Sequence, residues 1–193
     1  MKDNSFFIAV LRDGALLGLV FALSRTLVNY LQLQVDMPIT KMYLLLSLET
    51  ILSIVVFVWL LYRFSKRRSL SADEREGYTY GQGLVYAFVI SLLTGIVVGL
   101  ANTLFIAVIG YESYVDSLIA NMENTIEFVA KLDPTGAAAD SYNNMMTTLL
   151  DTLESSTRPS VFDNILASLN NYITWGTLLG LIIARVVRRE PKF

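Results

Sequence analysis

The sequence predicts an all-α polytopic membrane protein with four transmembrane helices and an extracytoplasmic two-helix hairpin between the third and the fourth. Of its 193 residues, 54% are hydrophobic and only 17% are charged, against about 25% in soluble domains. Four apolar stretches reach the length of about 20 residues that a helix needs to cross the hydrocarbon of a bilayer. Basic and acidic residues gather in different connecting segments, as they do in multi-pass proteins.

The four predicted spans lie near residues 10–33, 40–63, 84–109 and 164–187. The first carries Arg12 and Asp13 at its start, lacks the short basic region of a signal peptide, and runs long before any small-residue cleavage site. We therefore expect it to remain as an uncleaved span. A short loop with Asp36 and Pro38 follows, so the first two spans should form an antiparallel hairpin.

The distribution of basic residues predicts that both termini are cytoplasmic. The segment after the second span and the C-terminal tail contain Arg63, Lys66, Arg67, Arg68, Arg75, Arg185, Arg188, Arg189 and Lys192. The two loops on the opposite side contain only Lys41, Lys131 and Arg158. Because basic loops stay in the cytoplasm, an even number of spans follows.

The segment 111–160 differs from the other loops, since its apolar residues recur at helical spacing in two runs. These residues are Val115, Leu118, Ile119, Met122, Ile126 and Val129, then Tyr142, Met145, Met146, Leu149, Leu150 and Leu153. Asp133, Pro134, Thr135 and Gly136 separate the runs, which predicts an acidic helical hairpin outside the membrane. The expected divisions are 1–110, with a basic cytoplasmic loop at 64–83, then 111–160 and 161–193.

The composition argues against an enzyme. Without cysteine or histidine, the chain has no thiolate nucleophile, no disulfide and none of the commonest zinc or haem ligands. The acidic hairpin lacks the regular spacing of a calcium loop. We therefore expect no catalytic residues, no cofactor, no metal and no nucleic-acid partner.

Two ionisable residues, Arg25 and Glu49, lie well inside predicted spans. Each is about nine to ten residues from the loop that joins their helices, or roughly 14 Å of helix rise, so we expect them to form one interacting pair. Asn29 and Asn102 lie at similar depth and complete an intramembrane polar site. This site is either a structural ion pair or a binding site for a substrate or ion.

Glycines recur at four-residue spacing in three spans, a pattern that lets helix backbones approach closely. The pairs are Gly14 with Gly18, Gly95 with Gly99, and Gly176 with Gly180. Such contacts form within one chain or between two copies of a homo-oligomer. A four-helix bundle must first pack its own helices, which favours contacts within the chain.

A tyrosine- and glycine-rich motif, Tyr80, Gly81, Gln82 and Gly83, precedes the third span at its cytoplasmic side. Its glycines permit a tight re-entry, its tyrosine suits the headgroup level, and Gln82 can satisfy free backbone groups at the helix start. The alternative is a docking or headgroup site formed together with the basic loop.

The stretch from Gly77 to Phe88, followed by Ile90–Gly95, Ile96 and Gly99, resembles the bacterial membrane family known as domain of unknown function 4199 (DUF4199). The resemblance implies a four-span protein of the bacterial inner membrane with a variable outer insertion between spans three and four. Its members are often encoded near glycosyltransferases that use polyprenyl-phosphate carriers. The family has no established activity, so the resemblance implies no catalytic residues.

These observations favour a non-enzymatic membrane accessory or scaffold protein that contacts membrane lipids. By the resemblance, its partner would be a polyprenyl-phosphate glycosyltransferase and its role would be in envelope glycan or lipid-carrier processes. The alternative is a small oligomeric transporter or channel, or a lipid-headgroup-binding protein, that uses Arg25, Asn29, Glu49 and Asn102.

Overall fold

The computed structural model of the chain is all-α, as predicted, and describes residues 2–73, 75–132, 140, 144, 146–149, 151–152 and 157–191. Its fully described helices are α1 (Lys2–Gln32), α2 (Ile39–Leu70), α3 (Tyr80–Ile109), α4 (Tyr111–Leu132) and α6 (Val161–Val187). Four of them, α1, α2, α3 and α6, are long and apolar enough to cross a membrane. The protein is therefore a multi-pass membrane protein with four spans.

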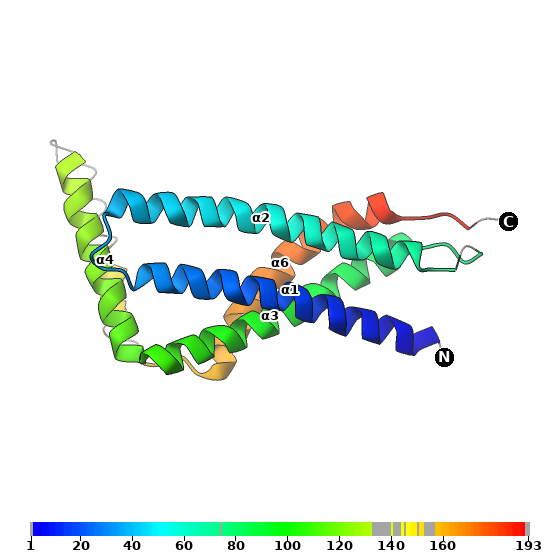
Figure 1. Cartoon of the computed structure of the whole chain (residues 1–193), viewed down its shortest axis with the longest axis horizontal. Helices are drawn as coiled ribbons and strands as arrows, with labels where there is room; N and C mark the ends of the chain where they lie inside the picture. Colours follow the sequence, from blue (N-terminus) through cyan, green and yellow to red (C-terminus); the bar gives the residue numbers. More distant parts are fainter. Residues whose placement is uncertain are drawn as a thin grey trace.

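The four spans run along the long axis of the molecule, and α4 lies across one end of them (Figure 1). Both chain termini and the α2–α3 connection lie at the opposite end, which we call the terminal end; the other is the α4 end. Helix α3 packs most extensively on α6 and next on α1, whereas α2 makes smaller contacts with α1 and α6. Helix α3 is thus the centre of the bundle and α2 is peripheral.

All four spans extend beyond their predicted limits at one or both ends, and α1 and α2 extend furthest. Helix α1 begins at Lys2. Helix α2 continues to Leu70 and α3 begins at Tyr80, so the predicted bounds 64–83 of the basic loop are wrong. Arg63, Lys66 and Arg67 lie on the last turns of α2, and the true connection is 71–79. Arginine and lysine are good helix formers, so the helix does not need to stop where the hydrocarbon does.

The start of α3 is fixed by a capping box and by the C-terminal tail. The Gln82 backbone N–H donates to the Thr79 hydroxyl, and the Gln82 side-chain oxygen accepts from the Thr79 backbone N–H at 2.9 Å. Tyr78 exchanges two backbone hydrogen bonds of 2.9 Å with Arg189. Gly77 has φ +70 and lies against the Arg189 carbonyl oxygen, so a side chain there would be both strained and obstructed.

The glycine pairs lie at contacts between helices of one chain. A Cβ at Gly99 would come within 2.5 Å of the Ile165 Cα, and one at Gly95 within 2.9 Å of the Leu169 Cα, both on α6. Gly176 and Gly180 of α6 lie against Ser91 and Ala87 of α3, and Gly14 and Gly18 of α1 lie against Leu93 and Val97 of α3. These small residues let α1 and α6 approach α3 closely.

Gly110, with φ +93, turns the chain from α3 into α4, so that α4 can lie across the bundle end. Asn121 donates to the Gln32 carbonyl oxygen at 2.5 Å and Asn124 to that of Val35 at 3.3 Å, which joins α4 to the end of α1 and to the α1–α2 loop. The first arm of the predicted outer hairpin is therefore present. Residues 146–149 and 151–152 of the second arm are helical, and the turn at 133–136 lies outside the described residues.

Packing of α2 differs between its two halves. Its buried residues are Met42, Phe57, Leu61, Phe64, Ser65 and Ser69. All but Met42 belong to the half toward the terminal end, where Leu61 is fully buried. Between Met42 and Phe57 no residue of α2 is buried, and this loosely packed half borders the site described next.

Candidate functional site

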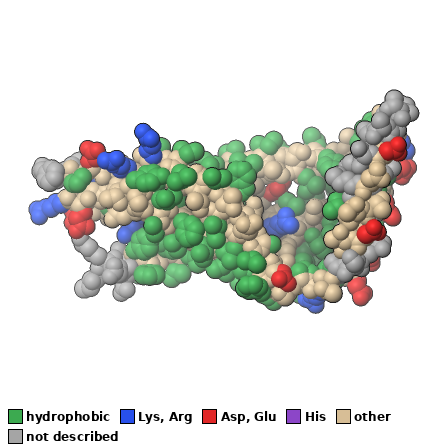
Figure 2. Space-filling view, turned by 180° about the vertical axis from the view of Figure 1, so that it is seen from behind, with side chains coloured by type: hydrophobic (Ala, Val, Ile, Leu, Met, Phe, Trp, Pro, Cys, Tyr) green, Lys and Arg blue, Asp and Glu red, His purple; other side chains and the backbone are tan. Residues whose placement is uncertain are grey.

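A cavity of about 410 Å³ lies between α1, α2 and α6 in the half of the bundle toward α4. Its lining residues are Phe21, Ser24, Arg25, Val28, Glu49, Thr50, Ser53, Ile54, Phe57, Val58, Asn171, Tyr172, Trp175 and Leu179. Figure 2 shows a hollow in this half of the molecule, with a basic side chain inside it and hydrophobic side chains beside it. The predicted residues Arg25 and Glu49 therefore share one cavity, and most of its wall is apolar.

Glu49 is held by two serine hydroxyls. Its Oε1 accepts a hydrogen bond from Ser24 of α1 and another, at 2.6 Å, from Ser53 one turn along α2. The two hydroxyl oxygens are 2.8 Å apart. Because both bonds end on Oε1, the other carboxylate oxygen accepts no hydrogen bond from any residue that the structure describes. The carboxylate can still accept hydrogen bonds from a ligand.

The predicted ion pair between Arg25 and Glu49 is absent: within the described part of the chain, Arg25 makes neither a salt bridge nor a hydrogen bond. The Arg25 charge instead lies within electrostatic range of Tyr114, at the start of α4, and of Tyr172 in the cavity wall. Burial raises the pKa of Tyr114 above its ordinary value, and the Arg25 charge acts against that rise. Two features account for the missing ion pair: the long Arg25 side chain can extend toward the end of the bundle, and Ser24 and Ser53 already hold the Glu49 carboxylate.

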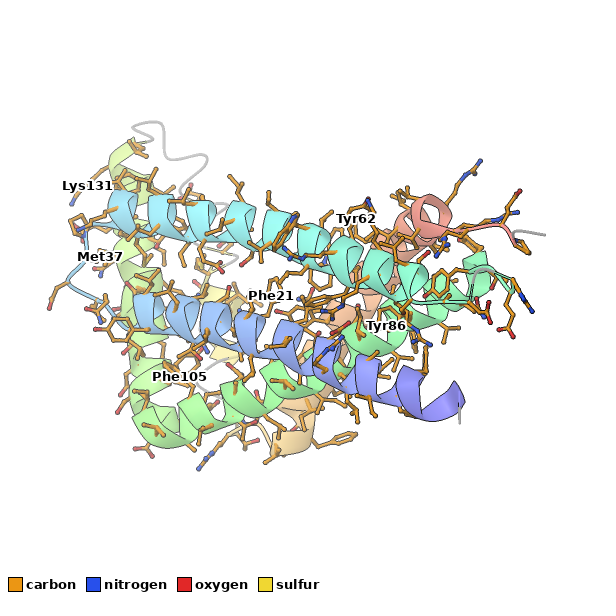
Figure 3. The ribbon with its side chains drawn as sticks, turned by 45° about the vertical axis from the view of Figure 1, so that its right-hand side comes forward. Phe21, Met37, Tyr62, Tyr86, Phe105 and Lys131 are labelled. Carbon is orange, nitrogen blue, oxygen red and sulfur yellow. The ribbon has the colours of Figure 1, made fainter. Side chains whose placement is uncertain are left out.

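Three aromatic rings, one from each helix around the cavity, are in mutual contact. The ring centroids of Phe21 and Phe57 are 5.3 Å apart, and that of Tyr172 is 5.7 Å and 5.9 Å from them. Figure 3 shows Phe21 midway along the bundle, between the α4 end and Tyr86. On α1 and α2 these rings lie on the side of Arg25 and Glu49 that faces the terminal end, while on α6 the lining continues past Tyr172 to Trp175 and Leu179.

The two predicted asparagines lie outside this cavity, in the seam between α1, α3 and α6. Asn29 donates to the Asn102 side-chain oxygen at 2.7 Å, and Asn102 donates to that of Asn164 at 2.9 Å. Asn29 is fully buried, and its own side-chain oxygen has no hydrogen-bond partner in the described chain. The predicted polar site is therefore two sites, a charged cavity and an asparagine ladder that joins three helices. Sequence reasoning missed Asn164, because a polar residue at the edge of a predicted span is unremarkable.

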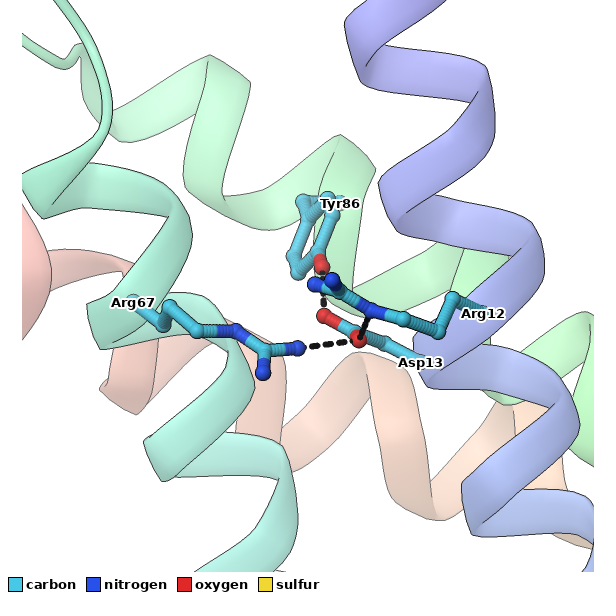
Figure 4. A network of polar contacts seen from close by, with 4 residues as sticks. All are labelled: Arg12, Asp13, Arg67 and Tyr86. Atoms are coloured by element: carbon cyan, nitrogen blue, oxygen red, sulfur yellow. Dashed lines mark hydrogen bonds and ion pairs between the residues drawn. The ribbon is translucent and has the colours of Figure 1, made fainter.

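Asp13, the most deeply buried carboxylate among the described residues, was also missed. Its side chain is 1% exposed and accepts bonds from the Tyr86 hydroxyl, from Arg67 of α2, and from Arg12 at 3.0 Å (Figure 4). Glu49 is therefore not the only carboxylate inside the bundle. The sequence did contain a signal for this cluster: Asp13 stands beside Arg12 in an apolar stretch, and Tyr86 lies in the third span just after the Tyr80–Gly83 motif. This cluster connects α1, α2 and α3.

The motif at the start of α3 forms part of the helix start. Tyr80 and Gly81 are exposed, Gln82 completes the capping box, and Gly83 is buried against the Ala184 backbone of α6. Burial raises the pKa of the preceding Tyr78 to about 12. Among the described residues no group of three Asp or Glu side chains could hold a metal ion.

Comparison with known proteins supports the resemblance drawn from this motif. A family model described as "Protein of unknown function (DUF4199)" matches residues 12–189. The chain belongs to the DUF4199 family. The match includes Arg25, Glu49, Asp13 and Tyr86, so the cavity and the buried cluster both lie within the DUF4199 region. No curated protein and no solved structure matches the chain.

Proposed function

We propose that this DUF4199 protein is a non-enzymatic membrane accessory protein that binds an amphipathic component of the bilayer in the cavity between α1, α2 and α6. One observation carries the proposal: the cavity contains both Arg25 and Glu49, and Arg25 has no partner in the described chain. A charge in a span is costly unless it is paired or faces a polar environment. A ligand with a polar head and an apolar body would satisfy the charge and fill the cavity.

The walls suit such a ligand. Phe21, Ile54, Trp175 and Leu179 offer apolar and aromatic contacts, while the serines and Arg25 supply polar groups. Binding sites for small molecules commonly combine an apolar wall with a few convergent polar groups. Catalysis would need a nucleophile or a general base, and Glu49 is the only carboxylate in the wall, already bonded to two serines.

Transport through the chain is the weaker alternative. A conduit would have to continue from the cavity to the terminal end, past the mutually packed Phe21 and Phe57 and the fully buried Leu17 and Leu61. Four spans are also few for a carrier. A cavity bordered by these packed residues fits a binding site better than a conduit. The resemblance to proteins encoded beside polyprenyl-phosphate glycosyltransferases makes a lipid-carrier process in the bacterial envelope a suitable setting.

Lipid retention tests the proposal. Val28 is half-buried in the cavity wall, whereas its neighbour Leu27 is exposed and outside the wall. Native mass spectrometry of protein extracted in polymer nanodiscs and released into mild detergent should show a bound lipid on the parent. The Val28→Trp variant, which fills the cavity, should retain roughly tenfold less, and Leu27→Trp should behave like the parent. Equal retention by both variants would contradict a cavity site, and ion or solute flux in proteoliposomes above empty vesicles would favour transport.

The location proposed for the chain is the bacterial inner membrane, with both termini in the cytoplasm. The two termini lie at the same end of the bundle, beside the basic turns of α2, which supports this orientation. Single cysteines can test it because the chain has none. Ser69 is buried and bonded to the Val187 carbonyl oxygen, so the exposed Ser71 is the better label site. Cysteines at Ser71 and Lys192 should react from the cytoplasm, and one at Ala138 only from outside.

A further inference from the structure

We propose that the cavity recognises an aminophospholipid, with the lipid phosphate on Arg25 and its primary ammonium on Glu49. This inference rests on the proposed function, because it assigns the ligand class of the same cavity. The two charges line one cavity, carry opposite sign and do not bond to each other. A ligand that carries both charges in one headgroup can satisfy both residues at once.

The charge balance favours a zwitterionic headgroup over an anionic one. An anionic lipid on Arg25 would leave the Glu49 carboxylate without a counter-charge in an environment where burying an unpaired charge is costly. Within the described chain no other basic residue lines the cavity. Phosphoethanolamine brings one positive and one negative group and leaves the cavity neutral.

The donors and acceptors match this assignment. The guanidinium has five N–H donors in a planar fork that suits phosphate oxygens, and none of them is used by a described residue. Glu49 has a carboxylate oxygen that accepts no hydrogen bond from the described chain. A primary ammonium donates three hydrogen bonds, whereas a quaternary amine donates none. The site should therefore prefer ethanolamine to choline.

The remainder of the cavity indicates a lipid and not a water-soluble zwitterion such as an amino acid. Ile54 of α2 and Trp175 of α6 both line the cavity and are more than half exposed on the faces of their helices. In a bilayer such faces meet acyl chains. The Arg25 charge lies within electrostatic range of Tyr114 at the α4 end, and Ile54 and Trp175 offer apolar faces of α2 and α6 to acyl chains.

Tryptophan quenching by brominated lipids tests the assignment, because the chain has only two tryptophans. Trp175 lines the cavity and Trp59 does not, although both are more than half exposed. In Trp59→Phe, the remaining Trp175 reports on the cavity; in Trp175→Phe, Trp59 reports on the bulk lipid. Vesicles would contain brominated-chain phosphatidylethanolamine, phosphatidylcholine or phosphatidylglycerol at low mole fraction in unbrominated phosphatidylcholine.

We expect the ethanolamine lipid to quench Trp175 with an apparent affinity about fivefold higher than either other lipid, and Trp59 to show no headgroup preference. Glu49→Gln should abolish the preference for the ethanolamine lipid over the choline lipid. Arg25→Gln should weaken the binding of both of these lipids. Circular dichroism in the same vesicles checks that both variants are folded. Equal quenching by all three lipids, or a preference for phosphatidylglycerol, would overturn the aminophospholipid assignment.

The two proposals fail in different ways. If the Val28→Trp comparison shows a cavity-bound lipid but Trp175 shows no headgroup preference, the cavity ligand stands and the aminophospholipid is wrong. If the parent and Val28→Trp retain lipid equally, the proposal of a cavity ligand is wrong, and the headgroup assignment is wrong with it.

Discussion

Two carboxylates of the described chain lie well inside the membrane spans, away from the helix ends, and their surroundings differ. Asp13, in the half toward the terminal end, is almost fully buried and is bonded to a tyrosine and two arginines from three helices. Glu49, in the half toward α4, is partly exposed in a cavity and is bonded only to serines, while Arg25 in the same cavity wall has no partner in the described chain.

This difference separates a structural charge from a charge available to a ligand. A buried ion whose hydrogen bonds are all satisfied joins the helices that supply its partners. Removing one partner leaves buried polar groups without hydrogen bonds, so their desolvation cost is no longer offset. A carboxylate with one oxygen unused, beside an unpaired guanidinium, costs little to alter and can bind something else.

The largest loss of stability should follow removal of Asp13. Asp13→Ala leaves the fully buried Tyr86 hydroxyl and the half-exposed Arg67 without their acceptor. We expect the free energy of unfolding to fall by about 3 kcal/mol, the lower end of the range for broken buried pairs, because Arg67 can reach water. Denaturant titration in mixed micelles measures the change. Asp36→Ala, at an exposed position of the α1–α2 loop, is the control, and an equally small effect of both variants would show that the cluster is not structural.

A smaller loss should follow Tyr86→Phe. This change removes one hydrogen bond to a buried carboxylate and retains the ring, so about 1.5 to 3 kcal/mol is expected from a bond to a charged group. Tyr80→Phe, on the exposed first turn of the same helix, should stay within about 0.5 kcal/mol of the parent. If the two variants are equally stable in the same titration, the Tyr86 hydroxyl does not hold Asp13.

The smallest losses should come from the cavity. Arg25→Gln and Glu49→Gln should each cost less than about 1 kcal/mol, since neither leaves a bonded ion behind and the amide oxygen introduced by Glu49→Gln can still accept from Ser24 and Ser53. The double variant should show the sum of the single losses within about 0.5 kcal/mol, as expected for residues that do not interact. Recovery of stability in the double variant would instead support the ion pair between Arg25 and Glu49 that the sequence predicted.

Much of the fold could be predicted because it follows from local composition. Apolar stretches of sufficient length indicate spans, and a run of helical spacing after Gly110 indicates α4. Gln82 could be assigned to a helix start because the capping box is encoded within four residues. The end of α2 was misplaced because hydropathy marks the edge of the hydrocarbon and not the end of the helix, which continues through Arg67 to Leu70.

The site was only half predicted, because depth along a helix can be counted from sequence but the direction of a side chain around it cannot. Arg25, Asn29, Glu49 and Asn102 do lie at comparable depth, yet Asn29 and Asn102 face the α3 seam while Arg25 and Glu49 face the cavity. The role of Asp13 could not be predicted, since its partners Arg67 and Tyr86 are distant in sequence.

The sequence by itself determined the class of the protein: four helices in a bilayer, glycines spaced for close packing, and two charges in the membrane that need an explanation. The tertiary structure decided what those charges do. Glycine contacts bring α1 and α6 onto α3, whereas α2 is packed tightly only toward the terminal end. Where it packs, Arg67 reaches Asp13 and the charge is satisfied; where it does not, a cavity remains and Arg25 has no partner in the described chain. Pairing of charges depends on distances of a few ångströms between helices, and only the packing of the whole bundle sets them.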